Sequence, residues 1–226
     1  MTVPRCLVII PDGNRRWARS HNHSQPVGHT YGLLNCRRIA KAAFERGVEH
    51  VVLWAASESN LHKRDPREIA FLFRLLKREL LYRSKRTDEI GFHLCGAWQE
   101  VNADLGLVEL VEKAHRKTAA HEKHLTVLFG YSGSTELVLA AEKAAQEGLV
   151  TKDSIREHLW TSHVPDVDLL IRTGVEDDPH WSDLLLPWQL QNTQLYFSDV
   201  CWPAFTIAHL EAAFDDYARR VRRAGA

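Results

Sequence analysis

The sequence predicts an α/β protein with a mostly parallel sheet flanked by helices. Two observations lead to this fold class: short apolar runs alternate with amphipathic helical patterns, and polar clusters follow several of these runs. With 226 residues, the chain is long enough to bury one sizeable core. We therefore expect a single domain over residues 1–226.

The predicted strands are short apolar runs, as expected for a parallel sheet that is buried on both faces. Ligands of such sheets usually bind beyond the carboxyl ends of the strands, so the segments after these runs are where a site is expected. The predicted strands are Cys6–Ile10, His50–Ala55, Gly91–Cys95, Leu125–Tyr131, Val167–Ile171 and Leu195–Phe197.

The clearest helical pattern follows Asp65 and Pro66, a capping residue and a first-turn proline. Apolar residues then recur on one face up to Arg83, which indicates a helix with a broad buried side. Other helices are predicted at Val27–Arg46, Val101–His121, Thr135–Glu147 and from about Ile207 to Arg222.

Composition excludes several classes of protein. Lys+Arg and Asp+Glu number 29 each, so we expect no nucleic-acid partner, and an anionic ligand must meet a local cluster of cations. The four cysteines are widely spaced and are interpreted as buried thiols. No apolar run approaches the roughly 18 residues of a membrane span, so a cytoplasmic protein is expected.

The densest polar cluster, Pro11–Trp17, directly follows the first predicted strand. The carboxylate of Asp12 is suited to hold Mg²⁺, and the backbone N–H groups of Gly13 and Asn14 can face anionic oxygens at a helix start. Arg15 and Arg16 add bidentate donors for a phosphate. This segment alone is also compatible with an ordinary capped helix and solvated arginines.

Two other strand ends carry similar groups. Ser57, Asn60 and Arg64 follow the second predicted strand, and Arg172 ends the fifth. His29 lies near the start of the helix after the Asp12 segment. Because parallel strands end at one edge of a sheet, these groups together indicate a site for a strongly anionic ligand. Nucleotide hydrolysis and dinucleotide binding are disfavoured, since neither glycine-rich phosphate motif is present.

These segments together resemble the cis-prenyltransferases, the family that includes undecaprenyl diphosphate synthases. The resemblance spans nearly the whole chain and implies a prenyltransferase with a six-stranded parallel sheet, an apolar tunnel for the isoprenoid, and a homodimer. The matching residues are Asp12–Ala18, Gly28-His29, Ser57 with Asn60 and Arg64, Gly130-Tyr131-x-Gly133, Asp168-Leu169-x-Ile171-Arg172-Thr173-Gly174, Trp188-Gln189, Leu195-Tyr196-Phe197 and Trp202-Pro203.

The resemblance also implies roles for individual residues. Asp12 would carry Mg²⁺ and assist departure of the allylic diphosphate, with Asn60 and Ser57 beside the reacting carbons. Arg172 and Ser182 would belong to the second diphosphate site, which normally takes isopentenyl diphosphate. The implied substrate-binding residues are Gly13, Asn14, Arg15, Arg16, Trp17, His29, Arg64, Arg172 and Ser182.

Several family positions are changed. Gln25 and Ser134 replace arginines, Gln194 replaces a metal-binding glutamate, and an insertion with two aspartates, within Gly174–Asp183, replaces a diphosphate-binding arginine. Each lost charged hydrogen bond costs about 1.5–3 kcal/mol, so two losses would weaken isopentenyl diphosphate binding by orders of magnitude. The second site is therefore interpreted as rebuilt.

Similar erosion is typical of lavandulyl-type synthases, which join two allylic diphosphates head to middle. We therefore expect coupling of dimethylallyl with geranyl diphosphate to an isosesquilavandulyl-type diphosphate. Bulky Trp54 and Phe129 beside the tunnel would suit a short product, although simple core packing explains them equally well.

Two alternatives remain open. One is regular short-chain cis elongation with isopentenyl diphosphate. The other is a non-catalytic accessory subunit, against which the intact Asp12–Trp17 segment argues, because such subunits usually lack the aspartate loop.

Overall fold

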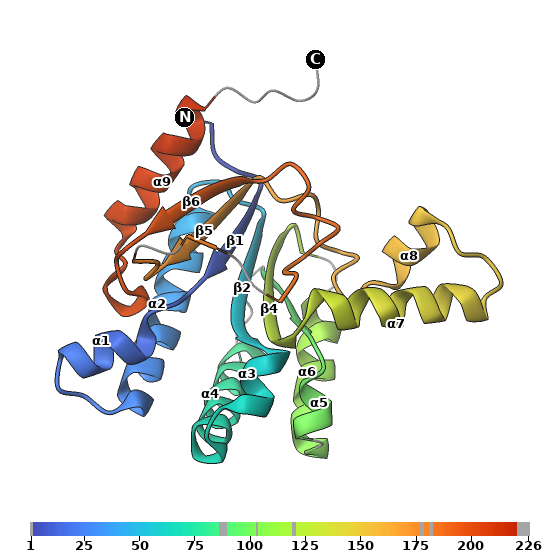
Figure 1. Cartoon of the computed structure of the whole chain (residues 1–226), viewed down its shortest axis with the longest axis horizontal. Coiled ribbons are helices and arrows are strands. Elements are labelled where there is room, and N and C mark those ends of the chain that lie inside the picture. The colour runs from blue at the N-terminus through green and yellow to red at the C-terminus, as the bar shows by residue number, and fades with distance from the viewer. Residues whose placement is uncertain are drawn as a thin grey trace.

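The sheet consists of six parallel strands. The computed structural model describes residues 2–85, 90–102, 104–118, 121–176, 179–180 and 183–220. The strand order is β3-β4-β2-β1-β5-β6, and every neighbouring pair is parallel (Figure 1). The strands are β1 (Cys6–Ile10), β2 (His50–Ser57), β3 (Ile90–Cys95), β4 (Lys123–Tyr131), β5 (Leu169–Thr173) and β6 (Gln194–Ser198).

The long helices were predicted to within a few residues, and the helix predicted over Val101–His121 is found at Leu105–Thr118. The helix start in the Pro11–Trp17 segment was predicted. The short helices at Glu58–Lys63, Trp98–Val101 and Lys152–His158 were missed, because one or two turns carry too little periodicity. The helices are α1 (Asn14–Ser20), α2 (Gln25–Glu45), α3 (Glu58–Lys63), α4 (Pro66–Ser84), α5 (Trp98–Val101), α6 (Leu105–Thr118), α7 (Gly133–Gln146), α8 (Lys152–His158) and α9 (Ile207–Arg219).

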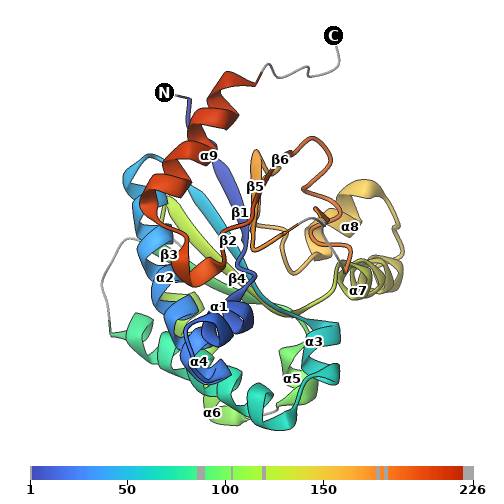
Figure 2. The ribbon, with the colours of Figure 1, turned by 60° about the vertical axis from the view of Figure 1, so that its left-hand side comes forward.

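Alternate side chains of each strand enter two different apolar clusters. Leu7 and Ile9 of β1 pack in a cluster that contains residues of α2, α4, α6 and α9. Val8 and Ile10 point to the other face and pack with residues of the segments around Val164 and Leu185. Burial on both faces explains why the strands read as continuous apolar runs. Figure 2 shows α2, α4 and α9 on one side, with α7 and α8 on the other.

The chain changes direction across the sheet at β1. From β1 it continues to β2 on one side, whereas β5 lies on the other side of β1 and continues to β6. In an open parallel sheet, such a switch point leaves a crevice at the carboxyl ends of the two strands. Here these strands deliver the Asp12 turn and Arg172.

The four cysteines differ in burial, and the described helices include no candidate membrane span. Cys6 and Cys95 are buried, whereas Cys36 and Cys201 are partly exposed, so the expectation of buried thiols is met by two of the four. Among the helices of the described residues, none is both long and apolar enough to cross a bilayer.

Candidate active site

The Asp12 turn joins β1 to α1 and has a tightly fixed backbone. The Asp12 carbonyl accepts hydrogen bonds from Trp202 N at 2.8 Å and from Thr173 Oγ1 at 2.9 Å. Gly13 has φ of 96°, and a Cβ there would lie 2.8 Å from Cα of Cys201. Only glycine fits this left-handed, crowded position without displacement. Contacts with Trp202, Thr173 and Cys201 therefore fix the backbone of the turn, while the Asp12 carboxylate faces the crevice.

Two arginines flank that carboxylate. Nη2 of Arg172 lies 3.2 Å from Oδ2 of Asp12, and Nη2 of Arg16 lies 3.6 Å from Oδ1. The Asp12 side chain nevertheless keeps 43% of its surface exposed. Arg16 also pairs with Glu176 at 2.6 Å. One accessible carboxylate thus lies among donors suited to phosphate oxygens.

The donor set at Asp12 suits Mg²⁺ that is held by few protein ligands. In the described part of the chain, no group of three or more His, Cys, Asp or Glu residues could hold a metal ion. Mg²⁺ usually takes only one or two protein carboxylates and completes its shell with water and substrate phosphates. The accessible Asp12 carboxylate fits that pattern.

A second set of side chains faces the crevice from α2 and α4. Oε1 of Glu68 accepts hydrogen bonds from Nη1 of Arg64 at 3.0 Å and from Nε2 of His29 at 3.1 Å. Burial lowers the pKa of His29 and also the pKa of Arg64. Sequence reasoning did not single out Glu68, although its position four residues after Arg64 was an available signal.

Ser57 and Asn60 are joined to each other at the end of β2. The Ser57 hydroxyl accepts a hydrogen bond from Asn60 N at 3.1 Å and thereby caps α3. This cap fixes the start of α3, so the Asn60 side chain is held on a short rigid turn at the crevice.

One polar cavity of about 670 Å³ is lined by the Asp12 turn, the flanking arginines, His29, Ser57 and Asn60. Arg15, Arg16, Arg19, Arg64 and Arg172 outnumber Asp12 and Asp183 among its described lining residues. The size is that of a small-molecule site, and the excess of cations favours a strongly anionic ligand.

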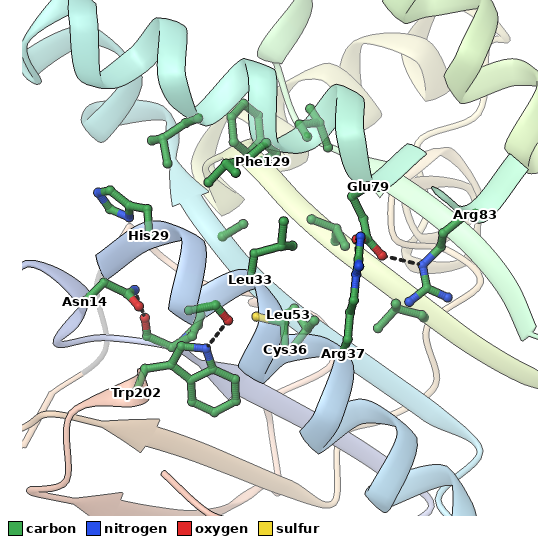
Figure 3. A pocket seen from close by; sticks show the side chains of 18 residues that line it. Asn14, His29, Leu33, Cys36, Arg37, Leu53, Glu79, Arg83, Phe129 and Trp202 are labelled. Atoms are coloured by element: carbon green, nitrogen blue, oxygen red, sulfur yellow. Dashed lines mark hydrogen bonds and ion pairs between the residues drawn. The ribbon is translucent and has the colours of Figure 1, made fainter. Parts of the chain in front are cut away.

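An apolar pocket of about 110 Å³ lies next to the polar cavity. The two share Pro11, Asn14, His29 and Ala55 in their linings. The pocket lies between α2, α4 and the sheet (Figure 3). A ligand with a polar head and a hydrocarbon tail could therefore occupy both at once.

The structure brings most of the predicted site residues together. The predicted residues in the cavity lining are Asp12, Gly13, Asn14, Arg15, Arg16, His29, Ser57, Asn60, Arg64 and Arg172. Ser182 lies outside the described residues. Arg19, Ser59 and Asp183 also line the cavity. They were not predicted, because no motif in the sequence marks these three positions as ligand-binding.

Trp17 lies apart from the other predicted site residues, and its contact with the substrate stays a prediction. It is absent from the lining of the described cavity, and its ring instead packs on His21 at 4.4 Å and on Tyr31 at 4.9 Å between centroids. The reason is helical geometry, because the turn of α1 that presents Arg15 and Arg16 directs Trp17 towards α2 and the α1–α2 connection.

Gln25, one of the changed family positions, lines the polar cavity. Of the two bulky residues expected beside the tunnel, Phe129 lines the apolar pocket, whereas Trp54 lines the polar cavity. Gln194 begins β6 and pairs in register with Leu169 at the start of β5, so it lies at the opposite end of the sheet. Within one chain, Gln194 therefore does not contribute to this cavity.

Replacement of Gly28 by alanine should test how α1 is held. A Cβ at Gly28 would lie 2.3 Å from the Asn14 carbonyl oxygen and 2.9 Å from Cβ of Ala18. We expect Gly28→Ala to lower the free energy of unfolding by about 1–3 kcal/mol and to reduce activity by moving the Asp12 turn. Urea unfolding and steady-state kinetics would measure both.

Gly106→Ala provides the matched control. Gly106 is also helical, and a Cβ there would meet only side-chain tips of Asp104 and Lys77, at 3.2 and 3.9 Å. This variant should be neutral or slightly stabilising, since alanine is the better helix former. Equal effects of the two substitutions would contradict the close-packing argument.

Comparison with known proteins identifies the family. A profile of the family described as putative undecaprenyl diphosphate synthase matches residues 10–225. The chain belongs to this prenyltransferase family. It is 35% identical over 227 residues to an isoprenyl transferase of Chromobacterium violaceum, which covers 98% of this chain and 88% of that protein.

Other members of the undecaprenyl diphosphate synthase family show the same extent of likeness. A ditrans,polycis-undecaprenyl-diphosphate synthase of Xylella fastidiosa is 32% identical over 238 residues, with 99% of this chain and 90% of that protein covered. A crystal structure of lavandulyl diphosphate synthase from Lavandula x intermedia, in complex with dimethylallyl diphosphate, superposes with a TM-score of 0.85. It is 28% identical, and 97% of each chain is covered. The chain is thus a prenyl diphosphate synthase with the cis-prenyltransferase fold.

Proposed function

We propose that this synthase joins two short allylic diphosphates head to middle, with geranyl diphosphate as donor and dimethylallyl diphosphate as acceptor. The observation that carries the proposal is that the arginine side chains beside β5 are already paired with groups of the protein. Arg172 is engaged by Asp12 and by the carbonyl of His180, while Glu176 binds Arg16. The contacts of Arg172 support the interpretation that the second diphosphate site is rebuilt.

In the proposed reaction, the Asp12 turn and the cluster of arginines bind the donor diphosphate. Mg²⁺ held by Asp12 would neutralise charge on the departing diphosphate. Arg15, Arg16 and Arg64 would donate hydrogen bonds to its oxygens as the C–O bond of the donor breaks. Fixed donors of this kind accelerate the step only if they bind the separated charge more strongly than the intact ester.

The acceptor then reacts at its central alkene carbon. A new C–C bond forms between that carbon and C1 of the donor, and the acceptor loses a proton from a methyl group. The products are one irregular C15 diphosphate, one free diphosphate and one proton. The neighbouring apolar pocket would shield the allylic cation from water.

Regular elongation with isopentenyl diphosphate is the competing function. It is favoured by the isoprenyl transferases that are 32–35% identical to this chain. The lavandulyl synthase structure, with its dimethylallyl diphosphate, supports the irregular reaction instead.

We also propose that the enzyme is a homodimer. Figure 1 shows α7 and α8 projecting sideways from the sheet. Val138, Leu149 and Val150 on this arm are more than half exposed. Apolar side chains gathered on one projection often mark a protein interface. Light scattering coupled to size exclusion should give twice the chain mass of 25.9 kDa.

Product analysis tests the proposed reaction. The pure protein would be incubated with Mg²⁺ and with dimethylallyl diphosphate alone, with added geranyl diphosphate, or with added isopentenyl diphosphate. Mass spectrometry of the dephosphorylated alcohols should reveal a branched C15 alcohol from the two allylic substrates. A linear Z alcohol that forms only with isopentenyl diphosphate would overturn the irregular assignment.

A further inference from the structure

The far end of the apolar pocket carries three charged side chains. Its sides are apolar residues such as Leu33, Leu72 and Phe129, whereas Arg37, Glu79 and Arg83 complete the lining. In Figure 3, His29 and Asn14 lie at one end and these three charged residues lie together at the other. We call Arg37, Glu79 and Arg83 the charged floor.

The charged floor is fully paired around one buried carboxylate. Glu79 is only 6% exposed. Its Oε2 lies 2.6 Å from Nη2 of Arg37, and its Oε1 lies 2.8 Å from Nε of Arg83. The arginines are themselves held by aromatic rings, with Arg37 3.8 Å from the Tyr82 centroid and Arg83 5.7 Å from the Phe92 centroid.

Such a cluster forms a firm boundary for a hydrocarbon. Displacing Glu79 would separate it from both arginines and leave a buried charge without partners, which typically costs several kcal/mol. A hydrocarbon tail offers no hydrogen bond in exchange. A growing or incoming tail can therefore displace leucines of the pocket walls more easily than it can displace this floor.

The depth of the pocket can be compared with the length of a prenyl tail. His29 and Arg37 are eight residues apart on α2, which corresponds to about 12 Å along the helix. Four carbon–carbon bonds of about 1.5 Å give roughly 5 Å for an extended five-carbon unit. The depth therefore matches two units, the length of a ten-carbon tail.

The volume of the pocket sets a tighter limit. At about 110 Å³ it is smaller than the engineered cavity of roughly 150 Å³ that holds one benzene molecule. His29 lines both cavities, so the depth counted from it includes the mouth, where the first five-carbon unit would lie beside the diphosphate. The interior of the pocket would then take only the second unit. A fifteen-carbon tail exceeds both the depth and the volume.

From this arrangement we infer that Arg37, Glu79 and Arg83 form the floor that limits the donor tail to ten carbons. The inference deepens the proposed function, because it concerns the donor of that same reaction. It identifies the three residues as determinants of chain length that act by closing the pocket, without contact with the reacting atoms.

The test replaces the charged floor by apolar residues of similar volume, in the variant Arg37→Met/Glu79→Leu/Arg83→Met. Substitution of a whole buried ion cluster is often neutral for stability, whereas removal of one partner is not. The kcat/KM of farnesyl diphosphate relative to that of geranyl diphosphate should rise about tenfold or more. A folded variant with an unchanged ratio would overturn the inference.

The control alters an ion pair between Lys77 of α4 and Asp104, the residue before α6, neither of which lines the described pocket. Nζ of Lys77 lies 3.1 Å from Oδ2 of Asp104, and both side chains are nearly half exposed. Lys77→Met/Asp104→Asn should leave the ratio of the two donors unchanged. An equal change in this control would show that the effect arises from helix stability, and it would equally overturn the inference.

A single variant decides the question if the triple variant does not fold. In Arg37→Met, Glu79 keeps its bond to Arg83, so no buried carboxylate loses all partners. The ratio should then rise by about threefold, and an unchanged ratio would count against the floor. Both donors are assayed with dimethylallyl and with isopentenyl diphosphate as acceptors. Failure of the head-to-middle reaction therefore remains distinguishable from failure of the length limit.

Discussion

Asp12→Asn should reduce kcat by about 10³-fold, because a neutral amide neither holds Mg²⁺ nor supports the leaving charge. The substitution is nearly isosteric, and the hydrogen bonds that fix the turn go to the Asp12 backbone carbonyl. The free energy of unfolding should therefore change little. Product formation in single turnover and urea unfolding of the same preparation would measure the two effects separately.

Asp168→Asn is the matched control at the other end of the sheet. One carboxylate oxygen of Asp168 accepts backbone hydrogen bonds from Arg5 at 2.7 Å and Cys6 at 2.9 Å. An amide oxygen can accept these bonds too, so activity should remain near that of the wild type. Full activity of Asp12→Asn would remove the catalytic role assigned to the Asp12 turn and reopen the accessory interpretation.

The stability of the protein should fall steeply below neutral pH because of a histidine cluster remote from the active site. His50, His93, His115, His124 and His163 form this cluster. The rings of His93 and His163 stack at 3.8 Å, and Nε2 of His93 lies 3.1 Å from Nδ1 of His124. They come from β2, β3, β4, α6 and the segment after α8.

The direction of the pH effect follows from the lowered pKa values. Burial lowers the pKa of His93 to about 3, and the pKa of His50 and of His163 to about 4. The unfolded chain titrates near the ordinary value of about 6.5, so below that pH it binds protons that the folded protein does not. The contribution of these neutral histidines to the free energy of unfolding is complete above about pH 6.5 and is lost as the pH falls towards 4.

The expected size is large for a protein of marginal stability. Each of these three histidines contributes up to about 2 kcal/mol of lost stability between pH 7 and pH 5. Partial solvent access and the nearby negative charge of Glu49 reduce this, so about 2–4 kcal/mol is expected for the three together. Urea midpoints from pH 7.5 to pH 5 would measure the change.

Two histidine variants separate the cluster from general acid effects. His93→Phe should reduce the number of protons taken up on unfolding by about one. The slope of the free energy of unfolding against pH should therefore fall by roughly 1.4 kcal/mol per pH unit. His62→Phe replaces an exposed histidine of α3 and should leave the slope unchanged. Parallel slopes for wild type and His93→Phe would contradict the titration of a buried cluster.

Local features of the fold could be predicted because their physical causes lie within a few residues. The bounds of β1 were predicted as Cys6–Ile10 and are found there. Asp65 caps α4 through a bond from Arg67 N at 2.7 Å, with Pro66 as its first residue. The Asp12 turn was recognised because a strand and a polar helix start adjoin in sequence.

The arrangement of the site depended on contacts between distant segments. Arg172 lies 160 residues after Asp12, and the two meet only because β5 pairs with β1. Glu68 joins Arg64 to His29 because α4 packs near the start of α2. Trp17 packs on Tyr31 of α2 because of the turn of α1, a contact that the motif alone did not indicate.

The sequence by itself determined the alternation of strands and helices, the Asp12 turn and the family. Only the tertiary structure decided the order of the strands, the charged floor beneath the apolar pocket and the gathering of five histidines. The physical reason is that hydrophobic period and capping act over a few residues. Strand order and side-chain packing, in contrast, depend on which distant surfaces bury one another, and a linear pattern does not specify that choice.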